Sequence, residues 1–506
     1  MINKQITPPE VQLKRYFWLI MFLQLLLWSL LPVFIRHSTT HDIIEALTWG
    51  RQFEWGYEKN PFLVGILAHL GGLFGSNGFG IYLIQQLFIL LGVWSTKQLT
   101  FELSHNRSYA FISATALLLY FFYNFEVQLN NDNYILQGLL PFSALCFYRG
   151  IKNNDLKQWF FSAASLALAT LAKYSAVLFL PLYILYLLFS KQGKKYLFSS
   201  KPYLAFLLYG LMLLPHLIWL NYQSFHPLHY AFLERGKLQQ LTHLEYLFYN
   251  SSSLLSIFLE MLPGLLAILL AIEYKTGSIA KLLDSDGRFF SCLMGLGPII
   301  LLFILASVLG FLIRTEWFMP FLSFLGTAFF VIFQPSISKR SITRYIVFLT
   351  ALMLTTGFIY IIISKKRTAI YYPGPEIANV ATQLWHTQYK TKLAYVAGSR
   401  YTAGYIAFYS PDKPQVWVDW NSKKSPWVDL NTLRCKGGLF VIENSNDKAH
   451  KKNDFSPIIR QQFPKLLDVP AQDFQWYRNP SHKPPITVRF ALLPPNKLYC
   501  HSINDK

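Results

Sequence analysis

The sequence predicts an all-α polytopic membrane protein with about eleven transmembrane helices, followed by a C-terminal soluble α/β domain. Apolar residues make up 53% of the 506 residues and charged residues only 14%, whereas soluble domains contain about 25% charged residues. The apolar excess lies almost entirely before residue 364, and the remainder has the composition of a water-soluble domain. We therefore expect a transmembrane domain over residues 1–364 and a soluble domain over residues 365–506.

Each predicted span is an apolar stretch close to the length that crosses a bilayer, about twenty residues. The first is too long for a removable signal peptide and lacks a small-residue cleavage site. Lys173 interrupts one continuous apolar run and divides it into two predicted spans. The spans cover residues 16–35, 79–97, 108–124, 134–149, 158–172, 174–190, 203–221, 254–272, 289–312, 317–334 and 345–363.

The distribution of Lys and Arg residues over the loops predicts the orientation of these spans. With the N-terminus inside, the inside segments before residue 364 contain 18 of these residues and the outside loops contain 7. Because positive charge favours the cytoplasmic side, this split predicts a cytoplasmic N-terminus and a C-terminal domain outside. The net charge of +20 then reports membrane topology, and nucleic acid is not an expected partner.

The predicted outside segments are two long loops, residues 36–78 and 222–252, and the tail. The first loop contains two amphipathic stretches, residues 42–55 and 61–74, which we expect to lie at the membrane interface. In the tail, short apolar segments such as KLAYVAG, QVWVDW and GLFVIEN alternate with Pro, Gly and Asp breaks, a pattern typical of an α/β domain. The tail also holds Cys435 and Cys500, and an oxidising compartment would allow them to form a disulfide, a question the sequence leaves open.

The first loop concentrates carboxylates beside the membrane, at Asp42, Glu45, Glu54 and Glu58. Asp42 and Glu45 are three residues apart, so they share a face if the stretch is helical. An acid held at the bilayer edge is costly unless it is used or paired. Since Asp42 closely follows the first span, we interpret it as functional, and Glu54 and Glu58 as ordinary solvated loop charges.

The first loop carries a set of short motifs: D-x-x-E-A at residues 42–46, then W-G, then G-Y-E-K-N-P at residues 56–61. This set resembles the first loop of the polyprenyl-phosphate-dependent sugar transferases, a family that includes the protein O-mannosyltransferases and the lipid A aminoarabinose transferases. Further similar motifs follow in the family's order: QLNNDN (128–133), LAKYSAVLFLP (171–181), PHLIWLNYQSFHPLHYAFLER (215–235) and RTEWFMP (314–320). The sequence departs from the family at two places. Members often carry adjacent Asp-Glu, whereas Asp42 and Glu45 are three residues apart, and related members read Lys-His-Pro-Pro in place of Lys59-Asn60-Pro61-Phe62.

The resemblance implies a GT-C fold and a glycosyltransferase that acts on the outer face of the membrane. Such an enzyme takes a sugar from a polyprenyl-phosphate donor, so cations must face the leaving phosphate and a carboxylate must accept the acceptor's proton. The site residues that it implies are Asp42 and Glu45 as catalytic groups, Lys59, Lys173, Arg235 and Arg314 as donor-phosphate ligands, and Tyr57, Asp132 and Tyr174 as substrate-loop residues. The plainer readings are that Lys173 is a snorkelling lysine and that Arg314 pairs with Glu316.

The resemblance implies the inner membrane of a bacterium, with the C-terminal domain in the periplasm, and leaves the acceptor open between lipid A or lipopolysaccharide and a protein. No cofactor is demanded, although a divalent metal stays open. The tight spacing of a zinc motif is absent among the outside-loop histidines His37, His41, His226, His229 and His243, and no metal ligands are predicted among them. The alternative function is a transporter or flippase of a lipid-linked sugar. A transporter would bury ionisable residues at mid-membrane, whereas this chain keeps nearly all its charges at the membrane surfaces.

Overall fold

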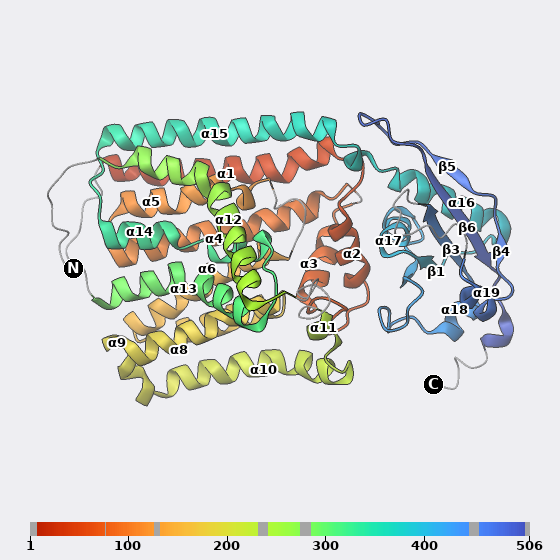
Figure 1. Ribbon diagram of the computed structural model, residues 1–506, viewed down its shortest axis with the longest axis horizontal. Coiled ribbons are helices and arrows are strands. Elements are labelled where there is room, and N and C mark those ends of the chain that lie inside the picture. Colours follow the sequence, from red (N-terminus) through yellow and green to blue (C-terminus); the bar gives the residue numbers. More distant parts are fainter. Residues whose placement is uncertain are drawn as a thin grey trace. The chain divides into compact units, whose positions relative to one another are not determined.

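The computed structural model describes residues 8–75, 77–125, 132–230, 241–273, 285–444 and 455–500, most of them in helices (Figure 1). The chain divides into two compact units. The first comprises Met1–Leu31, Lys59–Leu63 and Tyr82–Ile359, and the second comprises Pro32–Glu58, Val64–Ile81 and Tyr360–Lys506. Each unit therefore combines segments that lie far apart in the sequence.

Six helices are long and apolar enough to cross a membrane: α1 (Pro8–Ile35), α4 (Phe79–Ser104), α10 (Ser200–Tyr222), α12 (His243–Ala271), α13 (Ser285–Leu309) and α15 (Lys339–Lys366). Two bent pairs, Tyr174–Phe189 with Lys191–Phe198 and Thr315–Phe321 with Leu325–Phe333, raise the number to eight if each pair forms one span. The protein is thus an integral membrane protein with six to eight candidate spans among its described residues. Eleven spans stays a prediction, since the other three predicted stretches form helices that fall short of this test: α5 (Arg107–Thr115), α6 (Asn133–Lys152) and α7 (Leu156–Thr170).

The remaining elements of the first unit are short and connect these helices. They are η1 (Ala116–Leu119), η2 (Phe121–Tyr123), η4 (Tyr174–Leu178), α8 (Phe179–Phe189), α9 (Lys191–Lys194), η5 (Lys195–Phe198), α11 (His226–His229), η7 (Thr315–Trp317), η8 (Met319–Phe321) and α14 (Leu325–Phe333).

Local sequence explains where several helices begin and how closely they pack. The side chain of Asp155 accepts a hydrogen bond from the backbone N–H of Lys157 at the start of α7, and Thr242 forms a capping box with Glu245 at the start of α12. Helices α4 and α6 cross at Gly92, where a Cβ atom would lie 2.0 Å from the carbonyl oxygen of Gln137. Small residues permit such close crossings between membrane helices.

The second unit contains a mixed six-stranded sheet. Its strands are β1 (Tyr395–Gly398), β2 (Gln415–Val418), β3 (Gly438–Asn444), β4 (Leu467–Asp468), β5 (Gln472–Phe474) and β6 (Ile486–Leu493). The order is β2-β1-β3-β6-β4, with β5 also paired to β6; β1 runs parallel to β2 and β3, and β6 runs antiparallel to its neighbours. The segments KLAYVAG, QVWVDW and GLFVIEN supply β1, β2 and β3.

Helices accompany this sheet: η9 (Thr368–Tyr371), α16 (Gly374–Tyr389), α17 (Arg400–Tyr409), α18 (Leu430–Lys436), α19 (Pro457–Gln462) and η11 (Lys497–Tyr499). A buried cluster that includes Trp417, Phe440 and Phe463 joins the strands to α18 and α19. Cys435 at the end of α18 forms a disulfide with Cys500, just after η11.

The predicted first loop, residues 36–78, belongs to the second unit except for the segment Lys59–Leu63. Helix α2 (His41–Gly50) crosses α3 (Leu63–Gly72) where a Cβ atom on Gly50 would lie 1.9 Å from the carbonyl oxygen of Gly65. It packs against α17 at Gly404, where a Cβ atom would meet the Ile44 side chain at 2.4 Å. Because neither crossing has room for a side chain, glycine at these positions fixes the placement of α2.

Hydrogen bonds from the residues before α2 add to this attachment. The hydroxyl of Ser38 donates to the carbonyl of Tyr372 at 2.7 Å, and the hydroxyl of Tyr405 donates to the carbonyl of Thr39 at 2.8 Å. Residues Ile43 to Gly50 are all buried, so in the structure α2 is a packed helix of the second unit. Its predicted place at the membrane interface stays a prediction.

Candidate functional site

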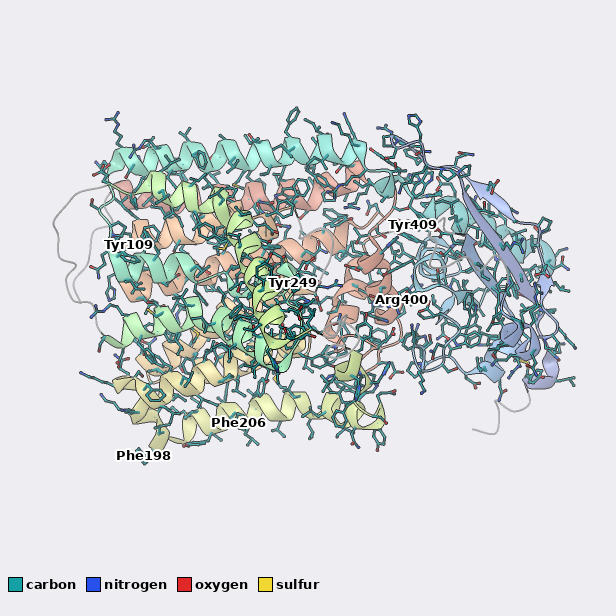
Figure 2. The ribbon with its side chains drawn as sticks, in the orientation of Figure 1. Tyr109, Phe198, Phe206, Tyr249, Arg400 and Tyr409 are labelled. Carbon is teal, nitrogen blue, oxygen red and sulfur yellow. A yellow bond between two sulfur atoms is a disulfide. The ribbon has the colours of Figure 1, made fainter. Side chains whose placement is uncertain are left out.

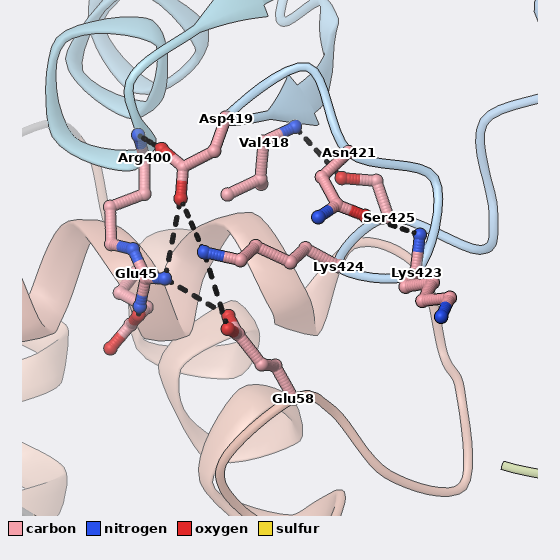
Figure 3. A network of polar contacts seen from close by, with 9 residues as sticks. All are labelled: Glu45, Glu58, Arg400, Val418, Asp419, Asn421, Lys423, Lys424 and Ser425. Atoms are coloured by element: carbon pink, nitrogen blue, oxygen red, sulfur yellow. Dashed lines mark hydrogen bonds and ion pairs between the residues drawn. The ribbon is translucent and has the colours of Figure 1, made fainter. Parts of the chain in front are cut away.

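The second unit contains a network of charged side chains centred on Arg400, the first residue of α17 (Figures 2 and 3). Nη1 of Arg400 contacts Oε1 of Glu45 at 2.6 Å, and Nη2 contacts Oε2 of Glu58 at 3.0 Å and Oδ2 of Asp419 at 3.4 Å. Nζ of Lys424 lies 2.9 Å from Oδ2 of Asp419 and 3.5 Å from Oε1 of Glu58. The first loop and the tail are thus joined by five charged side chains.

Electrostatics within this network favour the charged forms. Burial alone would raise the pKa of Asp419, but the hydrogen bond from Lys424 and the charge of Arg400 outweigh burial and lower this pKa. Burial alone would lower the pKa of Arg400, but Glu45, Glu58 and Asp419 together raise it. A guanidinium can donate to several carboxylates in a fixed geometry, so Arg400 is suited to hold the two first-loop acids in place.

Aromatic packing positions the loop between α2 and Glu58. The ring of Tyr57 is buried and stacks on Trp49 at 5.3 Å between centroids, with Trp427 of the tail edge-on at 6.3 Å. A Cβ atom on Gly65 would lie 2.9 Å from Cε2 of Tyr57. Tyr57, a predicted substrate-loop residue, is therefore enclosed within the second unit, and this packing presents Glu58 to Arg400.

Asp42 lies in the first turn of α2 and is exposed, whereas Glu45, three residues later, is buried. The Thr40 side chain caps the helix by accepting a hydrogen bond from the N–H of Ile43. A carboxylate in the first turn is stabilised by the helix dipole. Asp42 is therefore the more accessible of the two predicted catalytic acids, while Glu45 is paired to Arg400.

In the first unit, Lys173 directly precedes η4, and its side chain reaches the N-terminus of α6. Its Nζ donates to Oδ1 of Asp132 at 3.0 Å and to Oδ1 of Asn133 at 2.7 Å. An ammonium group has three donors, so the contacts within the described residues use two of them. Nδ2 of Asn133 in turn donates to the carbonyl of Glu316 at 2.9 Å, which connects Lys173 to η7.

Other predicted residues lie on segments connected to this group. The N–H of Leu63 donates to the carbonyl of Leu171 at 3.1 Å, which brings the segment Lys59–Leu63 to the end of α7, two residues before Lys173. Lys59 itself lies over the ring of Tyr230 at 5.8 Å. Arg314 is exposed and directly precedes η7, and the hydroxyl of Tyr174 pairs with Nε2 of His216 at 3.2 Å.

The structure thus brings Lys173 and Asp132 together in the first unit, and Glu45 into the Arg400 network of the second. Arg235, a predicted phosphate ligand, lies outside the described residues, as does most of the QLNNDN motif. Among the residues that are described, no three His, Cys, Asp or Glu side chains are grouped to hold a metal ion.

Sequence reasoning missed most of the Arg400 network. Glu58, interpreted as a solvated loop charge, has a side chain only 5% exposed and paired to two cations, so that interpretation is wrong. Its place inside the G-Y-E-K-N-P motif was the available signal. Arg400, Asp419 and Lys424 lie in the tail, where no motif pointed to them.

Comparison with known proteins agrees with the resemblance seen in the motifs. Residues 58–219 match the family of dolichyl-phosphate-mannose-protein mannosyltransferases. The structure of ArnT from Cupriavidus metallidurans bound to undecaprenyl phosphate is similar with a TM-score of 0.60 at 13% identity, over 94% of this chain and 97% of that one. The arabinofuranosyltransferase AftD from mycobacteria is similar with a TM-score of 0.50 at 15% identity, over 96% of this chain and 42% of AftD.

No curated protein sequence matches the chain. At these identities the structural likeness shows the fold. The resemblance to the polyprenyl-phosphate-dependent glycosyltransferases with a GT-C fold is confirmed.

Proposed function

We propose that this protein is a glycosyltransferase that moves a sugar from a polyprenyl-phosphate donor to an acceptor on the outer face of a bacterial inner membrane. The observation that carries the proposal is the agreement between the match of residues 58–219 to a lipid-phosphate sugar transferase family and a fold shared with ArnT over nearly the full length of both chains. The acceptor is a group on lipid A or lipopolysaccharide, or on a protein.

The outer-face assignment has two supports. The distribution of Lys and Arg predicts a tail outside the cytoplasm. The Cys435–Cys500 disulfide is of the kind that persists in oxidising compartments such as the periplasm.

In the proposed reaction the bond between sugar C1 and the phosphate oxygen breaks, and C1 forms a new bond to an acceptor oxygen. The proton of a hydroxyl acceptor passes to a carboxylate, for which we propose Asp42 because it is exposed at the start of a helix held firmly in place. The released polyprenyl phosphate carries the negative charge. We propose that Lys173 stabilises it, together with Lys59 and Arg314, because the ammonium group of Lys173 retains a third donor beyond its two contacts within the described residues.

Glu45 and Glu58 receive a different role from Asp42 in this proposal. Both carboxylates are committed to Arg400, so they are suited to fix α2 and its following loop rather than to accept a proton. The catalytic role that the family resemblance implies for Glu45 stays a prediction.

The test replaces Asp42 with Asn in the full-length chain and measures transfer in membranes. Polyprenyl phosphates carrying mannose, arabinose or aminoarabinose serve as donors, with lipid A and a membrane protein fraction as acceptors. Mass spectrometry follows both the released polyprenyl phosphate and the mass added to the acceptor. We expect the wild-type chain to transfer one of these sugars and Asp42→Asn to be slower by about 10²–10⁴-fold, the range for loss of a general base.

Glu376→Gln is the matched control, because Glu376 is a carboxylate of the second unit that pairs with His37 at 2.8 Å. It should transfer at close to the wild-type rate. An unchanged rate in Asp42→Asn would remove Asp42 from the mechanism. If the intact donor moved across the membrane and no sugar were transferred, the alternative function, a flippase of a lipid-linked sugar, would be the better assignment.

A further inference from the structure

A cavity of about 400 Å³ lies in the first unit between helices α7, α8 and α10. This volume falls in the range of small-ligand sites, about 300–1,000 Å³. Aromatic and aliphatic side chains dominate its wall, among them Trp159, Leu166, Leu187, Leu197 and Phe206. Phe206 of α10 (Figure 2) is 58% exposed, so the wall of the cavity reaches the surface of the helices that we assign to the membrane.

The hydroxyl groups in the wall are already used within the protein. The hydroxyls of Tyr183 and Ser162 both pair with Oγ of Ser143, at 2.9 and 3.3 Å. The hydroxyl of Tyr209 pairs with Oγ1 of Thr170 at 3.2 Å, and that of Tyr203 donates to the carbonyl of Leu197 at 2.7 Å. A ligand with polar groups would gain little from such a wall, and a hydrocarbon chain would lose nothing. The cavity is therefore suited to an alkyl chain.

One end of the cavity is formed by a segment that runs across the helices. After α8 the chain bends by 86° into α9 and η5, Lys191–Phe198 (Figure 1). The bend is held by Asp286, whose carboxylate accepts hydrogen bonds from the N–H groups of Lys191 and Gln192 at 3.1 and 2.7 Å. A segment that runs at a steep angle to a membrane helix is suited to lie along the membrane surface, and Leu197 from this segment reaches the cavity wall.

The same segment is strongly cationic. The side chains of Lys191, Lys194 and Lys195 are exposed, and none of the three forms an ion pair within the part of the chain that the structure describes. Lys201 follows and donates to the carbonyl of Asn154 at 2.7 Å. Basic pockets between membrane helices on the cytoplasmic side are typical binding sites for anionic lipid headgroups.

We propose that this cavity binds an acyl chain of an anionic phospholipid whose headgroup phosphate contacts Lys194 and Lys195. The position of the charge distinguishes this ligand from the donor lipid. Trp159, in the cavity wall, lies near the start of α7, whereas Lys173 follows the end of this helix. The two residues are fourteen positions apart, which corresponds to about 21 Å along a helix. The site is therefore separate from the proposed donor-phosphate group, and its test does not depend on sugar transfer.

The test measures lipid binding to the purified full-length chain by native mass spectrometry and by the shift in unfolding temperature. Phosphatidylglycerol, phosphatidylcholine and polyprenyl phosphate are compared on the wild-type protein and on the double variant Lys194→Gln/Lys195→Gln. We expect phosphatidylglycerol to bind more tightly than phosphatidylcholine, and the double variant to lose about 30-fold in affinity for it. Lys339→Gln/Arg340→Gln is the matched control, since both side chains are exposed cations at the start of α15, and should bind phosphatidylglycerol like the wild type.

A second variant addresses the cavity itself. Ala163, in the cavity wall, is replaced by Leu to occupy part of the volume, and both phospholipids should then bind more weakly. If Ala163→Leu unfolds the chain, the binding measurements on Lys194→Gln/Lys195→Gln and its control decide whether the proposal holds. Equal affinity for the two phospholipids, or equal losses in the lysine variant and its control, would overturn the proposal. The proposal would also be overturned if polyprenyl phosphate displaced phosphatidylglycerol from the wild-type protein and bound the lysine variant with unchanged affinity.

Discussion

The Arg400 network and the Lys173 group use their cations in different ways. In the second unit, the guanidinium of Arg400 is divided among three carboxylates, and Lys424 neutralises two of the same groups. In the first unit, the ammonium of Lys173 meets one carboxylate and one amide oxygen. An arginine fork surrounded by acids is fixed in geometry, whereas a lysine with a remaining donor can still meet an anion.

The difference suggests a division of labour. The Arg400 network holds protein segments together, and the Lys173 group is available to a phosphate. Three changes test this distinction, the first two against a matched residue in the same unit.

Replacement of Arg400 by Met is expected to have the largest effect. The side chains of Arg400, Glu45 and Glu58 are only 15%, 10% and 5% exposed, and removing one partner of a buried ion pair costs about 3–5 kcal/mol because it leaves uncompensated charge. Hydrogen–deuterium exchange of α2 and α17 in the full-length chain measures this as a loss of protection. Arg460→Met serves as the control, because its partner Asp468 is 58% exposed and such surface pairs contribute about 0–1 kcal/mol.

The structural role of the Arg400 network would be contradicted if Arg400→Met abolished sugar transfer while the hydrogen–deuterium exchange of α2 and α17 stayed as in the wild type. Arg400 would then act on the substrate, and the second unit would contain a binding site of its own.

Replacement of Lys173 by Gln should lower donor turnover by about 10²–10³-fold, the range for loss of one group that stabilises developing negative charge. The neutral amide keeps hydrogen-bonding capacity toward Asp132 and Asn133, so exchange at the start of α6 should change little. Lys152→Gln is the control, since Lys152 is an exposed lysine that donates to the carbonyl of Glu102. Wild-type turnover combined with faster exchange in α6 would make Lys173 a structural residue.

The smallest expected effect concerns Asp419. Because its pKa is lowered in the folded protein, the stability that it contributes is present above its unfolded pKa, about 3.9. That contribution is lost as the pH falls through the folded value. Unfolding temperatures of the wild type and Asp419→Asn, compared from pH 6 to pH 3, should therefore converge toward the acid end. Curves that remain parallel over this range would show that the carboxylate of Asp419 is not stabilised by its neighbours.

Local signals predicted much of the fold. Apolar runs marked the helices because a membrane span is specified by its own residues, and alternating segments marked β1, β2 and β3. Hydropathy did not fix the lengths of the helices. The predicted span 158–172 forms α7, a helix of 15 residues, and whether it crosses the membrane stays a prediction. The first loop was expected at the membrane interface. Its amphipathic stretches pack as α2 and α3 of the second unit, and their place relative to the membrane stays a prediction.

The candidate site was predictable only where its residues carried motifs. The motif around residues 171–181 pointed to Lys173, and its neighbour Asp132 lay in another motif. Arg400 is the first residue of α17, and nothing within its own segment of the sequence indicates partners in the first loop. Glu58 was misread for the same reason, because its partners lie more than 340 positions away in sequence. Pairing over such distances is a property of the folded chain.

The separation between Glu45 and Arg400 has a consequence for how the protein is made. The two residues are 355 positions apart, and at about 5–20 residues per second a ribosome needs roughly 20–70 s to synthesise that length. Throughout this interval α2 has been made without α17, so the face of Ile44 that packs at Gly404 stays uncovered and Glu45 stays without its arginine. The first loop therefore reaches its final structure only after α17 has been translated.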